Sequence, residues 1–310
     1  MFEKTHECNK KRGKWTSPRH KCSTRVTIIA MNRPQPQHRA RKRFGQNFLH
    51  DATIIDRIAA AVQPRPGQHL VEIGPGQGAL TEALIGSGCA LDVIELDRDL
   101  VPGLLAAFCL NPGFKLHNAD ALTFDFAELL NSRSDNTGDN TGDKRQLLRV
   151  VGNLPYNIST PLIFKLLENC AIIQDMHFML QLEVVERMAA TPGSKHWGRL
   201  GIMTQYHCRV EHLFDVPPHA FRPEPKVQSA IVRLTPWAES PWQPCNESKL
   251  RALVKAAFAH RRKTLRNNLK EILSSGDLEA LGIDPGARAE TLQLKQFIEI
   301  TNALHANTTV

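Results

Sequence analysis

An amide, a proline and a tyrosine follow an apolar, strand-like segment at residues 147–153, in the order Asn153-Leu154-Pro155-Tyr156. The Asn153 side-chain carbonyl and the Leu154 backbone carbonyl can together accept both N–H groups of an exocyclic aromatic amine, which turns the lone pair of its nitrogen toward an electrophile. Pro155 stiffens the turn without adding a donor. Tyr156 offers a ring on which a base can stack. This order predicts group transfer to a base amine by positioning, without a covalent enzyme intermediate.

A glycine-rich loop at residues 74–78 follows another strand-like segment, residues 69–74. Glycines let the backbone turn tightly and approach a ligand in front of the helix that follows. Glu95 closes the next strand-like segment, 21 residues after Gly74, where an acid is expected to bind ribose hydroxyls. Together the loop and the acid favour a cofactor that contains a nucleoside.

The glycines of this loop are spaced G-x-G-x-G, unlike the G-x-G-x-x-G of dinucleotide sites, and Glu72 lies two residues before them. A carboxylate at that position opposes a pyrophosphate and suits a cofactor that carries ammonium and sulfonium cations. S-adenosyl-L-methionine has both cations and no phosphate. Asp120, after the segment that begins at residue 114, is then a candidate partner for the adenine amino group. An NAD-dependent oxidoreductase is the weakest alternative.

The elements that must position these residues alternate along the chain. Apolar runs predict strands at residues 69–74, 90–96, 114–120, 147–153 and 176–182. Helix-like segments lie between them, at residues 79–88, 99–109 and from Thr160 to about Cys170. This alternation predicts an α/β fold, a Rossmann-like parallel sheet with helices on both faces. Ligands of such sheets bind at the carboxyl ends of the strands, where the candidate residues lie.

Composition divides the chain into three parts. Residues 1–30 are basic and aperiodic, and they are either a solvated extension or a stretch upstream of a true start at Met31. A transit peptide is a minor alternative, because the segment holds few acids. Residues 31–240 are predicted to form the methyltransferase domain. Proline-rich sequence around residues 236–248 leads into a small, all-helical domain at 241–310, which we expect to bind RNA. A tandem repeat of DNTG at 135–142 predicts a surface loop without chemistry.

Positive charge is concentrated in two segments. The first fifty residues hold 13 of the 39 Lys and Arg residues but only two acids, so the remaining chain is slightly acidic. Residues 257–273 are predicted to form one helix with Arg262, Arg266 and Lys270 along one side and apolar residues on the other. A polyanion such as RNA or DNA is the natural partner of such segments.

The seven cysteines are an odd number and have no paired C-x-x-C spacing. They predict reduced thiols in a cytoplasmic protein and no bound metal. No apolar run approaches the roughly 20 residues that span a bilayer, so we expect no membrane partner.

The chain resembles the bacterial ribosomal small-subunit rRNA adenine dimethyltransferases from about Met31 to residue 305. The resemblance lies in six motifs: RKRFGQNFL (41–49), EIGPGQGALT (72–81), VIELDRDL (93–100), NADAL (118–122), NLPYNISTP (153–161) and FRPEPKVQSAIVRL (221–234). It implies S-adenosylmethionine-dependent N6,N6-dimethylation of two adjacent adenosines in the hairpin near the 3′ end of 16S rRNA. It also implies action on an immature 30S subunit, by a monomer and without a DNA partner.

The same resemblance implies roles for single residues. The cofactor-binding residues that it implies are Asn47, Leu49, Gly74, Glu95, Asp120 and Asn153. The catalytic residues are Asn153, Leu154, Pro155 and Tyr156, with Phe221 as a second stacking partner for an extruded adenine. Phosphate contacts are implied for Arg222, Lys226 and the cluster at 261–270.

Three alternatives from other classes stay open. A DNA adenine methyltransferase would use the same order of asparagine, proline and tyrosine to hold the amine of its target base. A large-subunit rRNA adenine methyltransferase would share most of the fold. A non-catalytic assembly factor or transcription-factor relative would keep the fold without the chemistry, although the intact Asn153 and Tyr156 count against it.

Overall fold

The computed structural model describes residues 45–134, 147–243 and 245–306. These residues belong to one compact unit. The predicted extension at 1–30, the first residues of the RKRFGQNFL motif and the repeat at 135–142 lie outside the described residues. The strands are β1 (Phe48–Leu49), β2 (His69–Ile73), β3 (Ala90–Glu95), β4 (Phe114–Asn118), β5 (Leu148–Asn153), β6 (Ile173–Gln181), β7 (Cys208–Val216), β8 (Phe221–Arg222) and β9 (Ser229–Pro236).

Eleven α-helices accompany these strands in the described part of the chain. Seven lie among the strands: α1 (Ala52–Val62), α2 (Ala79–Ile85), α3 (Val101–Phe108), α4 (Ala127–Ser134), α5 (Ser159–Leu167), α6 (Leu182–Ala189) and α7 (Arg199–His207). Four follow the last strand: α8 (Glu247–Ala257), α9 (Leu265–Asn268), α10 (Ser275–Ala280) and α11 (Leu294–Ala306).

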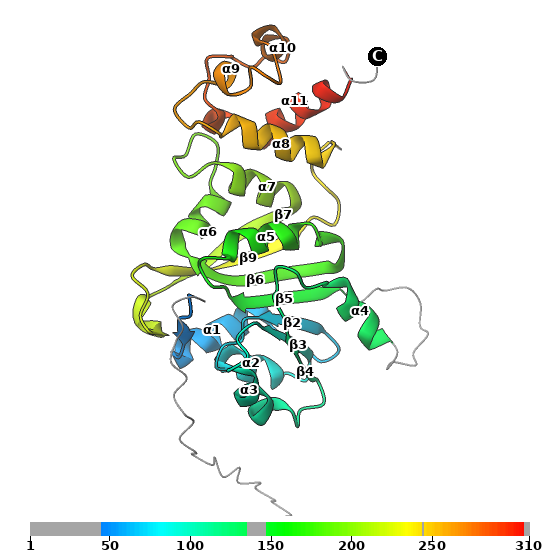
Figure 1. Cartoon of the computed structure of the whole chain (residues 1–310), viewed down its shortest axis with the longest axis vertical. Helices are drawn as coiled ribbons and strands as arrows, with labels where there is room; N and C mark the ends of the chain where they lie inside the picture. The colour runs from blue at the N-terminus through cyan, green and yellow to red at the C-terminus, as the bar shows by residue number, and fades with distance from the viewer. Residues whose placement is uncertain (1–44, 135–146, 244, 307–310) are drawn as a thin grey trace, which may run out of the picture. The chain divides into compact units, whose positions relative to one another are not determined.

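A seven-stranded sheet with the order β4-β3-β2-β5-β6-β9-β7 forms the centre of the unit (Figure 1). Strands β2 to β6 are mutually parallel, and each corresponds to a strand predicted from an apolar run. The α/β fold with a Rossmann-like sheet is therefore confirmed. Strands β7 and β9, which were not predicted, complete one edge of the sheet, where β9 pairs antiparallel with both β6 and β7. The connection between β7 and β9 holds no crossover helix, and strands joined in this way pair antiparallel.

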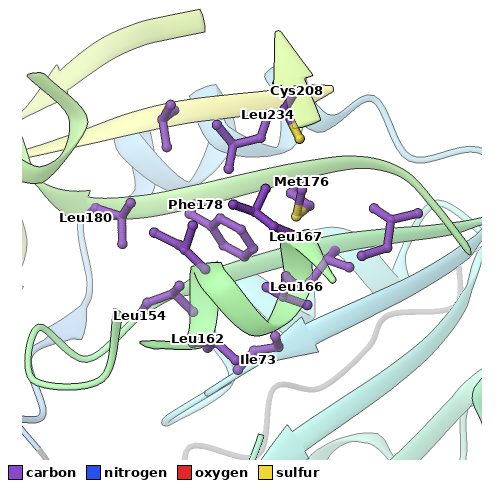
Figure 2. Close-up of a cluster of buried hydrophobic side chains, with 14 of the residues drawn as sticks. Ile73, Leu154, Leu162, Leu166, Leu167, Met176, Phe178, Leu180, Cys208 and Leu234 are labelled. Carbon is purple, nitrogen blue, oxygen red and sulfur yellow. The ribbon is translucent and has the colours of Figure 1, made fainter. Parts of the chain in front are cut away.

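Helices cover both faces of the sheet, as predicted. On one face α5, α6 and α7 contribute to a continuous buried cluster with the sheet, which Figure 2 shows around Leu162, Leu166, Met176, Phe178 and Leu234. On the other face a second cluster contains residues of α1 and α2, including Ile58 and Leu84. Burying each such side chain contributes roughly 1.5–3 kcal/mol. The sheet is thus fixed from both sides, and its strand ends form a rigid edge.

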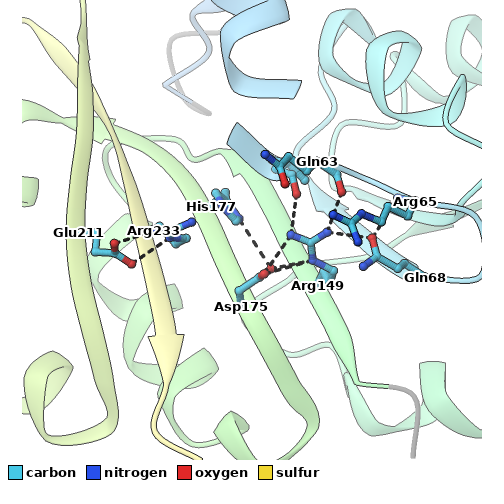
Figure 3. Close-up of polar contacts among 9 residues, drawn as sticks. Gln63, Arg65, Gln68, Arg149, Asp175, His177, Glu211 and Arg233 are labelled. Atoms are coloured by element: carbon cyan, nitrogen blue, oxygen red, sulfur yellow. Dashed lines mark hydrogen bonds and ion pairs between the residues drawn. The ribbon is translucent and has the colours of Figure 1, made fainter. Parts of the chain in front are cut away.

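Arg149 of β5 fixes the end of α1 against the sheet (Figure 3). Its guanidinium donates to the Val62 carbonyl at 2.6 Å, to the Gln63 carbonyl at 3.3 Å and to the Asp175 carboxylate at 2.9 Å. A cation beside the last carbonyls of a helix is also favoured by the helix dipole. Residues 45–50 lead directly into α1, whose C-terminal end this network holds against the sheet.

Beyond Asp175, the same region holds His177, whose ring is buried without a hydrogen-bond partner among the described residues. The nearer ring nitrogen lies 3.7 Å from Asp175. Burial lowers the pKa of His177 to about 4, so the ring is neutral at neutral pH.

The C-terminal helices share a core with α7. Trp197, Ile202 and Met203 belong to the same buried cluster as Leu253 of α8 and Phe297 of α11. The cluster therefore crosses the predicted boundary at residue 240. The division into domains at 31–240 and 241–310 stays a prediction.

The single helix predicted for residues 257–273 is wrong. Helix α8 ends at Ala257, and only Leu265–Asn268 form α9. The Leu265 N–H donates to the Ala287 carbonyl at 2.8 Å, and the Asn268 side chain donates to the Ala257 carbonyl at 2.7 Å. These bonds to other segments replace those of a continuous helix. Leu265, Leu269 and Leu273 are buried as predicted, while Arg266 and Lys270 are exposed.

In the described part of the chain, no helix is long and apolar enough to cross a membrane. No group of three or more His, Cys, Asp or Glu side chains within those residues is placed to hold a metal ion. The five cysteines described are free thiols.

Candidate functional site

The strand order reverses between β2 and β5, since the chain runs from β2 outward to β4 and then returns to β5 and β6. Ligands of open α/β sheets bind at such a switch point, outside the carboxyl ends of the strands. A hollow of about 1120 Å³, including its open mouth, lies there. Nine of the predicted site residues line it: Asn47, Leu49, Gly74, Glu95, Asp120, Asn153, Leu154, Pro155 and Tyr156.

The glycine loop brings the backbone close to two neighbouring segments. Gly74, Gly76 and Gly78 have φ angles of +69°, +60° and +85°, which side-chain-bearing residues rarely adopt. A Cβ on Gly76 would lie 3.0 Å from the Phe48 ring, and one on Gly78 would lie 2.7 Å from Phe108. The loop requires glycine at these positions because of both conformation and space.

Glu95 is held in place by two backbone donors. Its Oε2 accepts the Gly76 N–H at 3.2 Å, and its Oε1 accepts the Asp97 N–H at 2.8 Å. Burial raises the pKa of Glu95, while these donors act in the opposite direction. Each oxygen keeps a lone pair, so a fixed carboxylate can accept a pair of hydroxyl groups. Asp120 is fixed in a similar way, because its Oδ1 accepts the Leu122 N–H at 2.9 Å.

Four carboxyl groups line the hollow, and its described lining contains no Lys, Arg or His; the acids are Glu72, Glu95, Asp97 and Asp120. Glu72 is 2% exposed and accepts the Thr81 hydroxyl at 2.6 Å. Burial raises the pKa of Glu72 to about 7, the Thr81 hydrogen bond lowers it, and repulsion from Glu95 raises it further. A lining of this charge disfavours a phosphate-bearing ligand and suits a cation.

Asn153 ends β5 with its amide group oriented. Its Nδ2 donates to the Asn47 backbone carbonyl at 3.0 Å, which leaves Oδ1 as the acceptor for a ligand. The Leu154 side chain is 1% exposed in the cluster of Figure 2, and the Leu154 N–H donates to the Met179 carbonyl at 3.2 Å. The Tyr156 hydroxyl hydrogen-bonds the Ser229 hydroxyl at 2.8 Å. The predicted acceptors and the predicted ring therefore belong to a fixed turn.

Phe221 does not line the hollow in this structure. It is 1% exposed, and it pairs with Leu49 in the ladder between β8 and β1. Its ring belongs to the buried cluster that also contains Leu49. The stacking of an adenine between Phe221 and Tyr156 stays a prediction. In this structure Phe221 lies behind Leu49, its strand partner, which lines the hollow.

Sequence reasoning missed Gln46 and Asp97. The Gln46 Nε2 donates to Asp97 Oδ2 at 3.0 Å, and Asp97 is 2% exposed. Asp97 thus connects the segment at 45–49 to Glu95, whose carboxylate accepts the Asp97 N–H. The signal in the sequence was an acid two residues after Glu95, outside the strand and next to the predicted ribose site.

Comparison with known proteins identifies the family. Residues 37–306 match the family model described as ribosomal RNA adenine dimethylase. The chain belongs to this family. The predicted family resemblance is confirmed, and the hollow at the switch point is the candidate active site of this rRNA adenine dimethylase.

Its relatives include the ribosomal RNA small subunit methyltransferase A of Pseudomonas aeruginosa, which is 62% identical over 268 residues, 86% of this chain and 96% of that protein. The protein of the same name from Chromohalobacter salexigens is 58% identical over 271 residues, 87% and 93% of the two chains.

Two solved structures show the same fold. A dimethyladenosine transferase from Plasmodium falciparum matches with a TM-score of 0.68 and 23% identity, over 84% of this chain and 98% of the other. The 23S rRNA methyltransferase ErmE matches with a TM-score of 0.62 and 25% identity, over 84% and 100%.

Proposed function

We propose that this dimethylase uses S-adenosyl-L-methionine to dimethylate the N6 amines of two adjacent adenosines in the 3′-terminal hairpin of 16S rRNA. It acts as a monomer in the cytoplasm on an immature 30S subunit, and DNA is not its substrate. The observation that carries the proposal is the Asn153 amide, whose nitrogen is bound by the Asn47 carbonyl while its oxygen is left for a ligand of the hollow.

The residues of the hollow fit this cofactor. Glu95 would accept the ribose hydroxyls, and Asp120 would accept the adenine amino group. Glu72 would offset the positive charge of the amino acid end, which a lining of four carboxyl groups favours. Asn47 and Leu49 would cover the cofactor, next to the glycine loop. When bound, S-adenosylmethionine supplies an electrophilic methyl group.

The turn after β5 prepares the acceptor nitrogen. The lone pair of an aromatic amine is delocalised into the ring, so the amine is a poor nucleophile. The Asn153 side-chain carbonyl and the Leu154 backbone carbonyl would accept its two N–H groups and stabilise the positive charge that develops on nitrogen. Tyr156 would stack on the base, a contact worth about 1–3 kcal/mol. The chain's contribution is therefore orientation and electrostatics.

Methyl transfer to three substrates tests the proposal. Radiolabelled S-adenosylmethionine is supplied with unmethylated 30S particles, with 50S precursors and with duplex DNA, and the product nucleosides are analysed. We expect label in 30S particles alone, as N6,N6-dimethyladenosine. The likeness to ErmE makes a large-subunit substrate the second candidate, and label only in the 50S precursors would establish it. Label in DNA alone would refute both.

Exchange of the Gln46 and Asp97 side-chain types tests how the site is held. Gln46→Glu places two carboxyl groups together, and Asp97→Asn removes the acceptor charge that Gln46 binds, so each is expected to weaken cofactor affinity about tenfold. The double variant restores one donor and one acceptor, and most of the affinity should return. Calorimetry with S-adenosylhomocysteine measures all four proteins. If the double variant lost as much affinity as the two single variants together, the contact between Gln46 and Asp97 would not support the site.

A further inference from the structure

Two cysteines that are 38 residues apart in the chain lie in contact in the fold. Cys170 follows the end of α5, in a short 3-10 helix, and Cys208 is the first residue of β7. Their sulfur atoms are 3.8 Å apart, within reach of a hydrogen bond between thiols. Cys208 belongs to the buried cluster of Figure 2, against which Cys170 packs. Only the tertiary fold brings these two thiols together.

The two thiols differ in their access to solvent. Cys208 is 0% exposed, whereas Cys170 is half-buried, so a small oxidant in solution reaches Cys170 first. The hydrogen bond with Cys170, together with burial, raises the pKa of Cys208, which therefore keeps its proton at neutral pH. In redox-sensing pairs, an accessible sulfur reacts with the oxidant and a neighbouring sulfur then resolves the product. Cys170 and Cys208 have this arrangement.

The other three described cysteines are placed differently. The sulfurs of Cys89 and Cys245 contact oxygen atoms, at 3.6 Å and 3.5 Å, and Cys109 is exposed. None of the five described cysteines lines the hollow at the switch point. Methyl transfer in that hollow therefore does not use the pair of Cys170 and Cys208, and the pair can react independently of it.

We propose that Cys170 and Cys208 form a reversible thiol–disulfide site, which hydrogen peroxide closes and a dithiol reductant reopens. The Cys170 sulfur attacks the peroxide: an S–O bond forms as the O–O bond breaks, and the released hydroxide leaves with the thiol proton as water. The Cys208 sulfur then attacks the Cys170 sulfur. An S–S bond forms as the S–O bond breaks, and the hydroxyl leaves with the Cys208 proton as a second water. The two thiols lose two electrons, which the peroxide gains.

The disulfide joins the end of α5 to the start of β7. Its sulfurs need to approach from 3.8 Å to about 2 Å, a movement within the range of side-chain rotation. The closed loop contains β6, α6 and α7, and closing it restricts the unfolded chain, so the oxidised protein is expected to be the more stable form. The length of α5, roughly 13 Å, separates the pair from the turn at Asn153, so cofactor affinity should not change.

Peptide mapping of the full chain tests the site. The reduced protein is treated with graded hydrogen peroxide, quenched in acid, alkylated under denaturing conditions and digested. We expect the first disulfide to join the peptides that contain Cys170 and Cys208, and dithiothreitol to restore both thiols. The oxidised protein should melt about 5 °C above the reduced protein. Its affinity for S-adenosylhomocysteine, measured by calorimetry, should equal that of the reduced protein.

Three variants separate the roles of the two sulfurs. Cys170→Ser keeps a hydroxyl beside Cys208 but removes the accessible sulfur, so Cys208 should stay reduced and the thermal shift should disappear. Cys208→Ala removes the resolving sulfur, and dimedone should then trap a sulfenic acid at Cys170. Cys109→Ser is the matched control, because Cys109 is an exposed thiol outside the pair. It should form the disulfide and show the thermal shift of the wild type.

Several results would overturn the inference. If Cys170 and Cys208 stayed reduced while Cys109 was oxidised, the pair would not be reactive. A first disulfide to another cysteine would place the site elsewhere, and a sulfinic acid at Cys170 without a disulfide would show that the two sulfurs do not close. A lower melting temperature after oxidation would contradict the stabilising effect. The map of the wild type requires no variant to fold, so it decides the question even if Cys208→Ala is unstable.

Discussion

The Asn153→Ala variant is expected to lose about 1,000-fold in kcat, while its affinity for rRNA stays within a factor of two of the wild type. Removal of one oriented polar partner of a developing charge typically costs about 100- to 1,000-fold. Here the same truncation also removes the bond to the Asn47 carbonyl, so the segment at 45–49 loses a contact with β5. RNA contacts through phosphates do not involve Asn153, and they should persist.

Single-turnover transfer to unmethylated 30S particles, together with filter binding of the RNA, measures both quantities. The control is Asn169→Ala, since Asn169 donates to the Lys165 carbonyl at the end of α5 and does not line the hollow. Asn153→Asp is informative as well. It keeps an acceptor but places a carboxylate oxygen against the Asn47 carbonyl, so a large loss in kcat is expected there too. Activity of Asn153→Ala within tenfold of the wild type would refute the proposed role.

The sequence could predict the residues at strand ends. Gly74, Glu95, Asp120 and Asn153 each end or follow an apolar run, and parallel strands bring such ends to one edge of the sheet. Their convergence follows from the alternation of strands and helices alone. The glycine spacing and Glu72 then argue against a dinucleotide cofactor and favour a cationic one. For these residues, local sequence carries the information that the tertiary fold uses.

Other features depend on contacts between distant segments. The bond between Gln46 and Asp97 joins residues 51 positions apart, and no local periodicity reports it. The segment at 257–273 has the apolar pattern of a helix. Its N–H groups at Leu265 and Arg266, however, donate to carbonyls of residues 285–287. The Asn268 side chain donates to the Ala257 carbonyl, where α8 ends. Strands β7 and β9 were missed because charged residues interrupt their apolar runs, as in Arg209 and Glu211. Tertiary partners decide each of these cases.

The Glu72→Gln variant is expected to be more stable than the wild type at pH 8 without cofactor. The pKa of Glu72 is about 7 in the folded protein against an ordinary value of 4.5, so between these values the native state holds a proton that the unfolded chain has lost. The free energy of unfolding therefore falls as pH rises from about 4.5 through 7. A shift of this size corresponds to roughly 3 kcal/mol at most. The gain from glutamine should be about 1–3 kcal/mol, visible in urea denaturation at pH 8 and small at pH 4.5.

The same substitution is expected to remove a pH dependence of cofactor binding. Ionised Glu72 attracts a cationic ligand, so the affinity of the wild type for S-adenosylmethionine should rise about tenfold from pH 6 to pH 8 as this carboxyl ionises. The rise should be smaller for S-adenosylhomocysteine, which keeps the ammonium at its amino acid end but lacks the sulfonium charge, and absent in Glu72→Gln. Calorimetry in buffers of different ionisation enthalpy also measures the proton released on binding.

Glu82→Gln is the control for both Glu72 measurements, because Glu82 is an exposed acid in the first turn of α2. It should alter neither the stability by more than about 0.5 kcal/mol nor the pH dependence. If Glu72→Gln were less stable than the wild type at pH 8 and kept the full pH dependence of binding, the carboxyl would be a structural acceptor for Thr81 alone. The expected pair of results, higher stability with weaker binding, would instead mean that the protein keeps a destabilising buried acid because a bound cation compensates for it.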